Sequence, residues 1–559
     1  MEGCVRHISV HAAGVVIAPK PLTEYVPIQF DPKGGKKITQ YDMYSIEEAG
    51  LLKFDFLGIR NLAILADAIK LVKKFYDVDI DIENIPLSDK KTFSLLSRGQ
   101  TEGLFQLNGA GMTRYLKELR PTTIHDINAM IALFRPGPME IIPEYIKRKH
   151  DPKRVKYLDP RMKKFLGESY GLIVYQDDLL FSAIELAGYS WEEADKFRKA
   201  VGKKIPAEMA AQYEKFTKGI IEHGQTPEFA EKLWRLFEPF QAYGFNKAHA
   251  ASYGKVAYQT AYMKAHYPIE YMTAILTAES GDVEKIATII EECKNMKIPV
   301  LPPDINESYG GFTVIRENNE SREIRFGLYT IKNLGTDIAD AIIEERRING
   351  KFKSITDFLD RIKHKNLNKK SMEALIKSGA MDALGERGSL LSNLEEMLEY
   401  NREATQVSQN QTSLFGGAEI GLPQFKLRDA PPATQKDKLL WEKELLGLYI
   451  SGHPLDRIRE KLEKREINIR KIKEEMKSST PVTIAGIIET SRYVITKNNE
   501  RMAFLKISDL TSSIEAVAFP SIFKASLEIL VPEKCVAISG KISFRNGEKS
   551  IIIEAVKEV

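Results

Sequence analysis

Hydrophobic and polar positions divide this chain into a β-rich start, a long helical middle and an all-β end. Over residues 1–62, short apolar runs alternate with Gly and Pro, which is typical of strands joined by turns. From about residue 70 to 300, apolar residues recur three and four positions apart and the runs stop at prolines. This pattern predicts one large helical domain. A helix over residues 61–78 is expected to lead into this domain.

The pattern changes several times after residue 303. A small β-hairpin is predicted around residues 318–319, and two helical hairpins follow it. From residue 406 to 434 the composition turns to Gln, Ser, Gly and Pro, which is typical of a flexible linker. Charged amphipathic helices are expected over residues 436–447 and 455–476.

The C-terminal end of the chain predicts an all-β domain with turn residues between short apolar runs. The expected strands cover residues 482–488, 502–507, 514–519, 535–541 and 551–556, with a helix over 522–530 between the third and the fourth. Five short strands with one helix in this place fit an oligonucleotide-binding (OB) barrel. A generic small barrel is the alternative.

Composition is that of an ordinary multidomain globular protein. At 559 residues and 43% hydrophobic content, the chain is long enough for several cores. It shows neither an export leader nor an apolar stretch near 18 residues, so we expect no membrane insertion and a cytoplasmic location. The three cysteines, Cys4, Cys293 and Cys535, lie far apart, which argues against a disulfide framework and against a zinc site.

Positive charge is concentrated in two stretches, although the net charge is only +4. Residues 147–164 and 346–370 each hold nine Lys or Arg against two Asp. Such stretches suit contact with nucleic-acid phosphates, because each neutralised phosphate releases counterions. A solvated surface explains either stretch equally well.

Asp55 stands in an apolar run, residues 51–58, that predicts a short buried strand. An unpaired carboxylate in apolar surroundings costs several kcal/mol or takes up a proton, so a lasting charge implies a cation partner. One interpretation is an ion pair with Lys53 or Arg60 that only stabilises the fold. The other is a bound metal ion.

A series of motifs along the chain decides between these two interpretations of Asp55. The segments are 11–19, 39–43, 50–62, 103–107, 132–138, 174–176, 194–204, 243–249 and 446–455. The series covers essentially the whole chain. It resembles the C-terminal portion of the alpha, or catalytic, subunit of bacterial DNA polymerase III.

The resemblance implies an α+β multidomain protein with a partial β-rich palm, large helical fingers, a helix-hairpin-helix region and a C-terminal OB-type β-barrel. The expected domains are palm 1–70, fingers 71–305, tandem helix-hairpin-helix region 306–400, linker with clamp-binding peptide 401–435, helical connector 436–478 and OB-fold 479–559.

The resemblance also implies nucleotidyl transfer with two Mg²⁺ ions held by converging carboxylates. Asp55 corresponds to the third catalytic, metal-binding carboxylate, and the other two come from an Asp-x-Asp strand that would precede Met1. The Asp77, Asp79 and Asp81 series falls after Asp55, and we interpret it as surface. The chain alone is therefore expected not to synthesise DNA.

Side chains expected at the incoming nucleotide come from three places in the chain. Lys53 shares a strand face with Asp55, and a basic cluster lies along one helical side. The full set is Lys53, Arg198, Lys199, Lys203, Lys204, Tyr243, Asn246, Lys247 and His249. The alternatives are a solvated helix face for the basic cluster and a packed aromatic turn with a core histidine for residues 243–249.

Contacts with DNA and with a sliding clamp are expected further along the chain. Arg135 is a template-phosphate ligand or a helix-end cap. The turn Lys332, Asn333, Leu334 and Gly335 has the form of a helix-hairpin-helix, whose exposed N–H groups bind a phosphate, and a looser copy covers residues 368–384. Both could be packing hairpins.

The linker carries Gln411, Leu414 and Phe415, the polar anchor and apolar plugs of a peptide that binds the β sliding clamp. An inert linker is the alternative. The leading hypothesis is thus the C-terminal part of a replicative polymerase that binds primer-template DNA, dNTP, the clamp and other replisome subunits, with no membrane contact. A non-catalytic DNA- and clamp-binding module is the second. A ligase is improbable, because Lys-x-Asp-Gly is absent.

Overall fold

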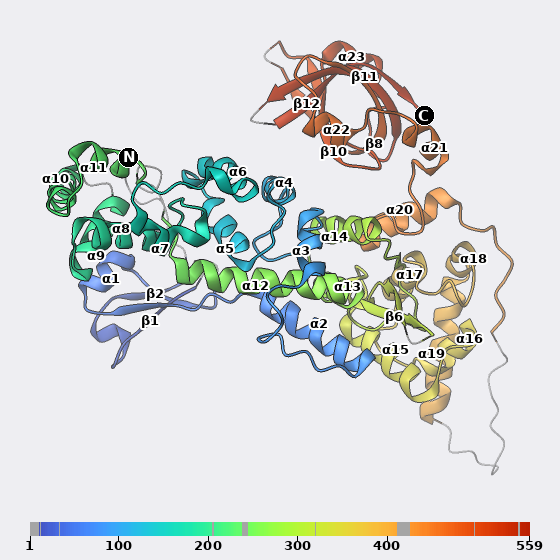
Figure 1. Cartoon of the computed structure of the whole chain (residues 1–559). Helices are drawn as coiled ribbons and strands as arrows, with labels where there is room; N and C mark the ends of the chain where they lie inside the picture. Colours follow the sequence, from blue (N-terminus) through green and yellow to red (C-terminus); the bar gives the residue numbers. More distant parts are fainter. Residues whose placement is uncertain are drawn as a thin grey trace. The chain divides into compact units, whose positions relative to one another are not determined.

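The computed structural model is shown in Figure 1, with helices and strands labelled in chain order. It describes residues 10–11, 13–32, 34–203, 206–237, 244–318, 320–410, 425–496, 498–545 and 548–559. The chain forms two compact units, residues 1–271 and 272–559. Within the described ranges, every helix is too short or too polar to cross a lipid bilayer.

The first unit opens with two small antiparallel ribbons. Strand β1 (Gly14–Ile17) pairs with β4 (Leu52–Asp55), and β2 (Ile28–Phe30) pairs with β3 (Lys37–Thr39). Helix α1 (Met43–Glu48) lies between β3 and β4 in the chain, and Asp42 caps its first turn. The buried core of this segment is small and consists of Val26, Ile46 and Leu51.

The predicted burial of residues 51–58 holds for Leu51, which is 3% exposed, and is wrong for residues 52–58. The register pairs Val15 with Phe54 and Ile17 with Leu52, which places these four side chains on one face of the β1–β4 ribbon. They are 47%, 43%, 51% and 66% exposed in that order, and Phe56 is 67% exposed. The reason is architectural: a two-stranded ribbon has no second layer in the described residues, so its apolar face stays open.

A long helical region follows, as the periodicity predicted. Helix α2 (Arg60–Tyr76) matches the helix expected over 61–78 and ends at Asp77 in the left-handed conformation. The helices after it are α3 (Lys90–Ser97), α4 (Ala110–Leu119), α5 (Ile124–Leu133), α6 (Ile142–His150), α7 (Lys163–Leu166), α8 (Gln176–Ala187), α9 (Trp191–Lys203), α10 (Pro206–Glu222), α11 (Pro227–Arg235) and α12 (Lys247–His266).

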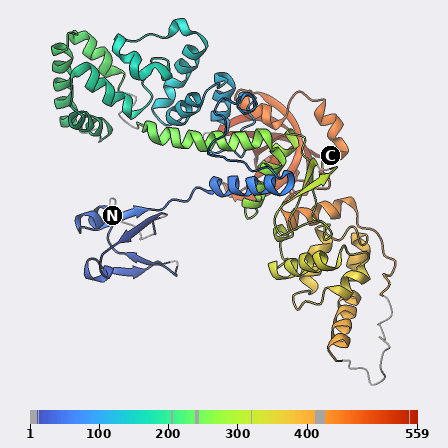
Figure 2. The same ribbon diagram turned by 60° about the horizontal axis from the view of Figure 1, so that its bottom comes forward.

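Helix α12 is the long central helix of this region and packs against α2, α3 and α5 (Figure 2). Its apolar residues lie on several sides, and Ala257, Tyr258 and Ala261 are fully buried. Helices α8 to α11 enclose an aromatic core around Phe197 and Phe216.

The second unit contains a three-stranded sheet in the order β5 (Val300–Leu301), β7 (Glu320–Arg325), β6 (Thr313–Glu317), which confirms the hairpin expected around residues 318–319. Helices α13 (Pro268–Ala278) and α14 (Val283–Asn295) precede the sheet, and the helices after it are α15 (Thr336–Asn349), α16 (Ile355–Arg361), α17 (Lys369–Lys377), α18 (Arg387–Ser392), α19 (Leu394–Asn410) and α20 (Gln435–Leu446). Helix α19 continues into the segment predicted as linker.

The single helix expected over 455–476 is wrong. The segment forms a 3-10 turn (Asp456–Ile458) and two short helices, α21 (Arg459–Glu463) and α22 (Ile469–Glu474). Asn468 caps α22 by accepting from the N–H of Lys471, and the N–H of Ile469 donates to Asp509 in the C-terminal domain at 2.7 Å. The barrel thus fixes α22 separately from α21, and this tertiary contact overrides the local periodicity.

The C-terminal domain is a closed five-stranded barrel, which confirms the predicted OB-type architecture. Its strands are β8 (Pro481–Ile495), β9 (Arg501–Ser508), β10 (Ser513–Ala518), β11 (Cys535–Arg545) and β12 (Glu548–Glu558), with α23 (Pro520–Ala525) after β10. The register of β11 and β12 shifts at Gly540, where a Cβ atom would lie 2.0 Å from the carbonyl oxygen of Ile552. Only glycine fits at this bend of the barrel.

Candidate functional site

Asp55 lies at the end of β4 in an ion pair with the neighbouring lysine. The Nζ atom of Lys53 is 2.5 Å from Oδ1 of Asp55, so both side chains point to one face of the strand. This hydrogen bond holds the pKa of Asp55 below its usual value. The Asp55 side chain is 54% exposed, so solvent screens the pair and its contribution to stability is small.

His11 is a third member of this cluster that sequence reasoning missed. Its Nδ1 accepts hydrogen bonds from the backbone N–H groups of Ala13 at 3.2 Å and Gly14 at 2.6 Å. An accepting Nδ1 carries no proton, so its 3.8 Å distance to Asp55 does not make a charge pair. A Cβ atom on Gly14 would lie 2.8 Å from that nitrogen, and this contact explains the glycine.

The donor set around Asp55 does not by itself fit a pair of magnesium ions. Among the described residues, no three His, Cys, Asp or Glu side chains gather around a point that could hold a metal ion. Both polar contacts of Asp55 use Oδ1, so the described part of the chain offers one carboxylate. Asp77 and Asp79 instead pair with Lys73, at 2.9 and 2.8 Å.

Two cations of the predicted basic cluster on α9 share one carboxylate of their own helix. Asp195 binds Arg198 through Oδ1 and Lys199 through Oδ2, both at 2.8 Å. Helix α9 ends at Lys203, while Lys204 lies outside the described residues. An anion that binds Arg198 and Lys199 therefore has to compete with Asp195.

Two sites predicted separately from the sequence form one stack in the structure. The guanidinium of Arg135 lies 5.3 Å from the ring centre of Phe245. The Phe245 ring lies 5.1 Å from that of His249, which lies 4.3 Å from that of Tyr253. Arg135 follows α5, so the packing of α5 on α12 brings the predicted template contact to the predicted nucleotide contact. His249 is exposed and is not a core histidine; Tyr243 lies outside the described residues.

The first turn of α12 is capped from two directions. Asn246 is the N-cap and accepts from the N–H of His249 at 2.9 Å. Asp177, in the first turn of α8, accepts from the N–H of Lys247 at 2.8 Å. The ammonium of Lys247 pairs with Glu168 at 3.0 Å. Asn246 and Lys247 thus have defined local roles that the sequence left open.

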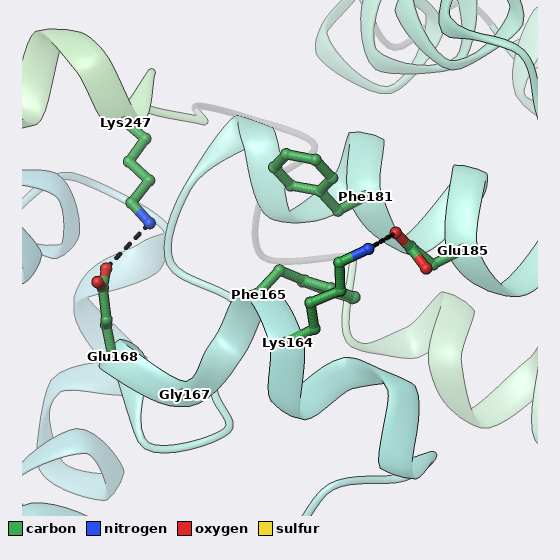
Figure 3. A pocket seen from close by; sticks show the side chains of 7 residues that line it. All are labelled: Lys164, Phe165, Gly167, Glu168, Phe181, Glu185 and Lys247. Atoms are coloured by element: carbon green, nitrogen blue, oxygen red, sulfur yellow. Dashed lines mark hydrogen bonds and ion pairs between the residues drawn. The ribbon is translucent and has the colours of Figure 1, made fainter.

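A hollow of about 390 Å³ borders this turn (Figure 3). Its lining comprises Lys164, Phe165, Gly167, Glu168, Phe181, Glu185 and Lys247. Two ion pairs lie at opposite ends of the hollow: Lys164 with Glu185 at 2.6 Å, and Lys247 with Glu168. The two phenylalanines lie between these pairs. The hollow is therefore apolar along its middle and balanced in charge at its ends.

Asp178 is a buried carboxyl group that sequence reasoning also missed. It lies next to Asp177 in α8, and only 2% of its surface is exposed. Its Oδ2 accepts from the N–H groups of Val174 at 2.8 Å and Tyr175 at 2.9 Å, which favours the charged form. Burial outweighs these bonds and raises the pKa of Asp178 to about 7.

The helix-hairpin-helix turn has the expected backbone but a shorter first helix. Leu328–Thr330, directly before the turn, is only a 3-10 turn and not the first α-helix of a helix-hairpin-helix. Asn333 adopts the left-handed conformation with φ 70°, as the turn requires. The N–H of Lys332 donates to the carbonyl of Leu445 at 2.9 Å and is not available to a ligand. Gly335 caps α15 with φ −70° and has open space where a side chain would lie.

Both basic stretches are partly used for internal contacts. In the first, Lys149 pairs with buried Asp126, and Arg161 binds Asp159 at 2.8 Å. In the second, Arg346 donates to the carbonyls of Ile305 and Ser308 at 2.7 and 2.8 Å. Fewer charges are thus available for phosphates than the counts suggested. The predicted clamp-binding residues Gln411, Leu414 and Phe415 lie outside the described residues.

Models of known protein families match four segments of the chain in order. Residues 1–58 match the bacterial DNA polymerase III alpha NTPase domain, and residues 61–224 match the bacterial DNA polymerase III alpha subunit finger domain. A helix-hairpin-helix motif matches residues 297–390. An OB-fold nucleic acid binding domain matches residues 482–559, which form the closed barrel.

Curated relatives match almost the entire chain. DNA polymerase III subunit alpha of Thermus aquaticus is 44% identical over 93% of the chain and 42% of the relative. The subunit of Aquifex aeolicus is 42% identical over 100% of the chain and 46% of the relative. That of Borreliella burgdorferi is 40% identical over 100% of the chain and 49% of the relative. The chain therefore spans less than half the length of these relatives.

Proposed function

Because this chain belongs to the family of bacterial DNA polymerase III alpha subunits, matching their C-terminal portion, we propose that it is the C-terminal part of a replicative DNA-directed DNA polymerase. The observation that carries this proposal is the collinear match of the four domain models, joined by relatives about 40% identical along the whole chain. The reaction proposed is template-directed addition of dNTP to a primer in the cytoplasm.

We propose that the incoming nucleotide binds near the first turn of α12. Its phosphates would meet Lys53, Arg198, Lys199, Lys203, Lys204 and Lys247, and its base and sugar would meet Tyr243, Asn246 and His249. The Arg135–Phe245–His249 stack supports this, because it joins a cation, through the buried ring of Phe245, to the exposed ring of His249. The carboxylates of Asp195 and Glu168 pair with three of these cations, Arg198, Lys199 and Lys247, until phosphate replaces them.

We propose that Asp55 supplies one carboxylate for the magnesium ions and that a further segment of an alpha subunit supplies the others. The chain of this sequence is then inactive alone. Two observations support this: the described residues offer one carboxylate at the site, and the apolar face of Val15, Ile17, Leu52 and Phe54 is open. An exposed patch of this kind is typical of a surface that another segment covers.

A reconstitution experiment tests the proposed function. The chain would be mixed with the N-terminal portion of an alpha subunit, and primer extension would be measured on primed DNA with and without Mg²⁺. We expect extension only when both polypeptides, Mg²⁺ and dNTP are present. If the two polypeptides co-elute as one complex and still extend no primer, the proposal is wrong.

The helix-hairpin-helix region and the barrel are proposed to hold duplex and single-stranded DNA, respectively. The segment with Gln411, Leu414 and Phe415 is proposed to bind the sliding clamp, and other replisome subunits would join the same assembly. These roles rest on the family and on the matched domains.

Gly335→Ala tests the DNA contact at the turn before α15. Gly335 has an ordinary φ of −70° and open space around its Cα atom, so alanine should leave the fold intact. A phosphate that approaches the N–H groups of this turn would meet the added methyl group. We expect duplex binding about fivefold weaker in a fluorescence-anisotropy titration, corresponding to roughly 1 kcal/mol, with a slightly lower Tm because alanine is a poorer N-cap than glycine.

The matched control for Gly335 is Gly350→Ala, at the end of the same helix. Gly350 also has open space around it, but its φ is +80°, so alanine there should lower stability without affecting a contact at the other end. Unchanged DNA affinity in Gly335→Ala would show that no phosphate approaches this turn.

A second candidate function is a non-catalytic module that binds DNA and the clamp. The lone carboxylate and the two matched nucleic-acid-binding domains favour it for the isolated chain. DNA binding that depends on salt but not on dNTP, together with failure of the reconstitution, would support this function over the first.

A further inference from the structure

A carboxylate on a different helix holds the start of α12. Oδ2 of Asp177 accepts the backbone N–H of Lys247 at 2.8 Å and lies 3.5 Å from the side-chain amide nitrogen of Asn246. The first N–H groups of a helix have no partner within the helix, so an outside acceptor can fix the direction of the first turn. A negative charge at this end is also favoured by the helix dipole.

The loop before α12 is attached to the same turn of α8. The N–H of Gln176 donates to the carbonyl of Phe245 at 2.9 Å, and Tyr175 and Phe245 form an isolated parallel β-bridge. A Cβ atom on Gly244 would lie 2.6 Å from Cγ of Gln176, so the loop lies close against the start of α8. Backbone and side-chain contacts together make this a joint between the two helices.

The side chain of Lys247 is held by a separate group. Its Nζ pairs with Glu168 at 3.0 Å (Figure 3). It also lies 5.8 Å from the ring centre of Tyr175. Asp177 therefore acts on the backbone of Lys247, whereas Glu168 acts on its ammonium group. This separation allows the two contacts to be tested one at a time.

We propose that Asp177 is a positioning residue for the nucleotide site. By accepting the N–H of Lys247 it sets the first turn of α12, and with it Asn246, Lys247 and His249, in the orientation that receives the nucleotide. The nucleotide as ligand rests on the proposed function, whereas the joint between α8 and α12 rests on the contacts alone.

The joint is tested first by hydrogen exchange of the chain itself. Asp177→Ala removes the acceptor, so amides in peptides covering residues 244–250 should exchange about tenfold faster. Asp177→Asn keeps an acceptor oxygen and should exchange as the unmodified chain does. Glu168→Gln is the matched control, because it weakens the side-chain contacts of Glu168 with Lys247 and His125 and leaves the backbone acceptor Asp177 in place. Equal exchange in Asp177→Ala and the unmodified chain would overturn the proposal.

The nucleotide role is tested in the reconstituted enzyme. We expect Asp177→Ala to raise KM for dNTP by about 5- to 20-fold, with a smaller change in kcat, and Asp177→Asn to restore KM. An unchanged KM in Asp177→Ala, although residues 244–250 exchange faster, would overturn the positioning role. If the unmodified pair of polypeptides neither binds dNTP nor extends a primer, the proposed function fails, and the exchange result still decides the joint.

Discussion

Asp55→Ala is expected to lower primer extension by the reconstituted enzyme by at least about 10³-fold, corresponding to roughly 4 kcal/mol of lost stabilisation. The family resemblance assigns Asp55 to the carboxylates that bind the divalent cation, and no other acidic side chain in the described part of the chain gathers with it. Asp55 is half-exposed in its ion pair with Lys53, so Asp55→Ala should cost little folding stability. The effect of the substitution should therefore fall on catalysis.

The informative companion is Asp55→Asn. Its side-chain oxygen still accepts the hydrogen bond from Lys53, but its negative charge is lost. If the Lys53–Asp55 pair only stabilises the ribbon, Asp55→Asn should extend primers as the unmodified enzyme does, and our assignment of Asp55 would be wrong. Asp67→Ala is the control for removing an exposed acidic side chain, because Asp67 pairs with Lys70 on α2 at 3.1 Å.

Asp178→Asn is expected to stabilise the protein at pH 8 by roughly 2–4 kcal/mol, with almost no effect near pH 4. Burial raises the pKa of Asp178 to about 7, against an ordinary value of 3.8. Below pH 3.8 the carboxyl group of Asp178 holds its proton in both the folded and the unfolded chain, so its burial costs no folding stability. As the pH rises to 7 the unfolded chain releases the proton more readily, and the folded state loses stability.

Urea unfolding between pH 4 and pH 8 measures this effect, in the transition of the unit that contains α8. Asparagine keeps an oxygen for the N–H groups of Val174 and Tyr175 and carries no charge. Asp159→Asn provides a control of opposite sign, because hydrogen bonds from Arg161 lower the pKa of Asp159 to about 2. A gain from Asp178→Asn that is the same at both pH values would contradict a raised pKa.

Local patterns predicted the type of most elements but failed where burial or packing decided the outcome. The five strands of the barrel follow from alternation and turn residues, and the bend at Gly540 fits the closure. Residues 51–58 have the composition of a buried strand, yet burial requires a covering layer that the described residues do not provide. The helix expected over 455–476 breaks because α22 packs on the barrel.

The candidate site likewise combines features that the sequence indicated with features that only the folded chain shows. Motif order alone indicated the family and singled out Asp55, Arg135, Lys247 and His249. It did not show that Arg135 stacks on Phe245, or that Arg198 and Lys199 share the carboxylate of Asp195. Asp177 and Asp178 had no signal in the sequence, and His11 stood in the motif segment 11–19 without an assigned role, because the importance of all three lies in what they contact.

The amino-acid sequence by itself determined the order of elements and the family, since periodicity and motif series depend on residues close together in the chain. Only the tertiary structure decided which charges pair across distant elements, as Lys149 does with Asp126, and which helix end is held. Asp177 and Lys247 are 70 positions apart, and their contact exists because α8 and α12 fold onto each other. A hydrogen bond acts over about 3 Å, so folded coordinates, and not spacing along the chain, determine such contacts.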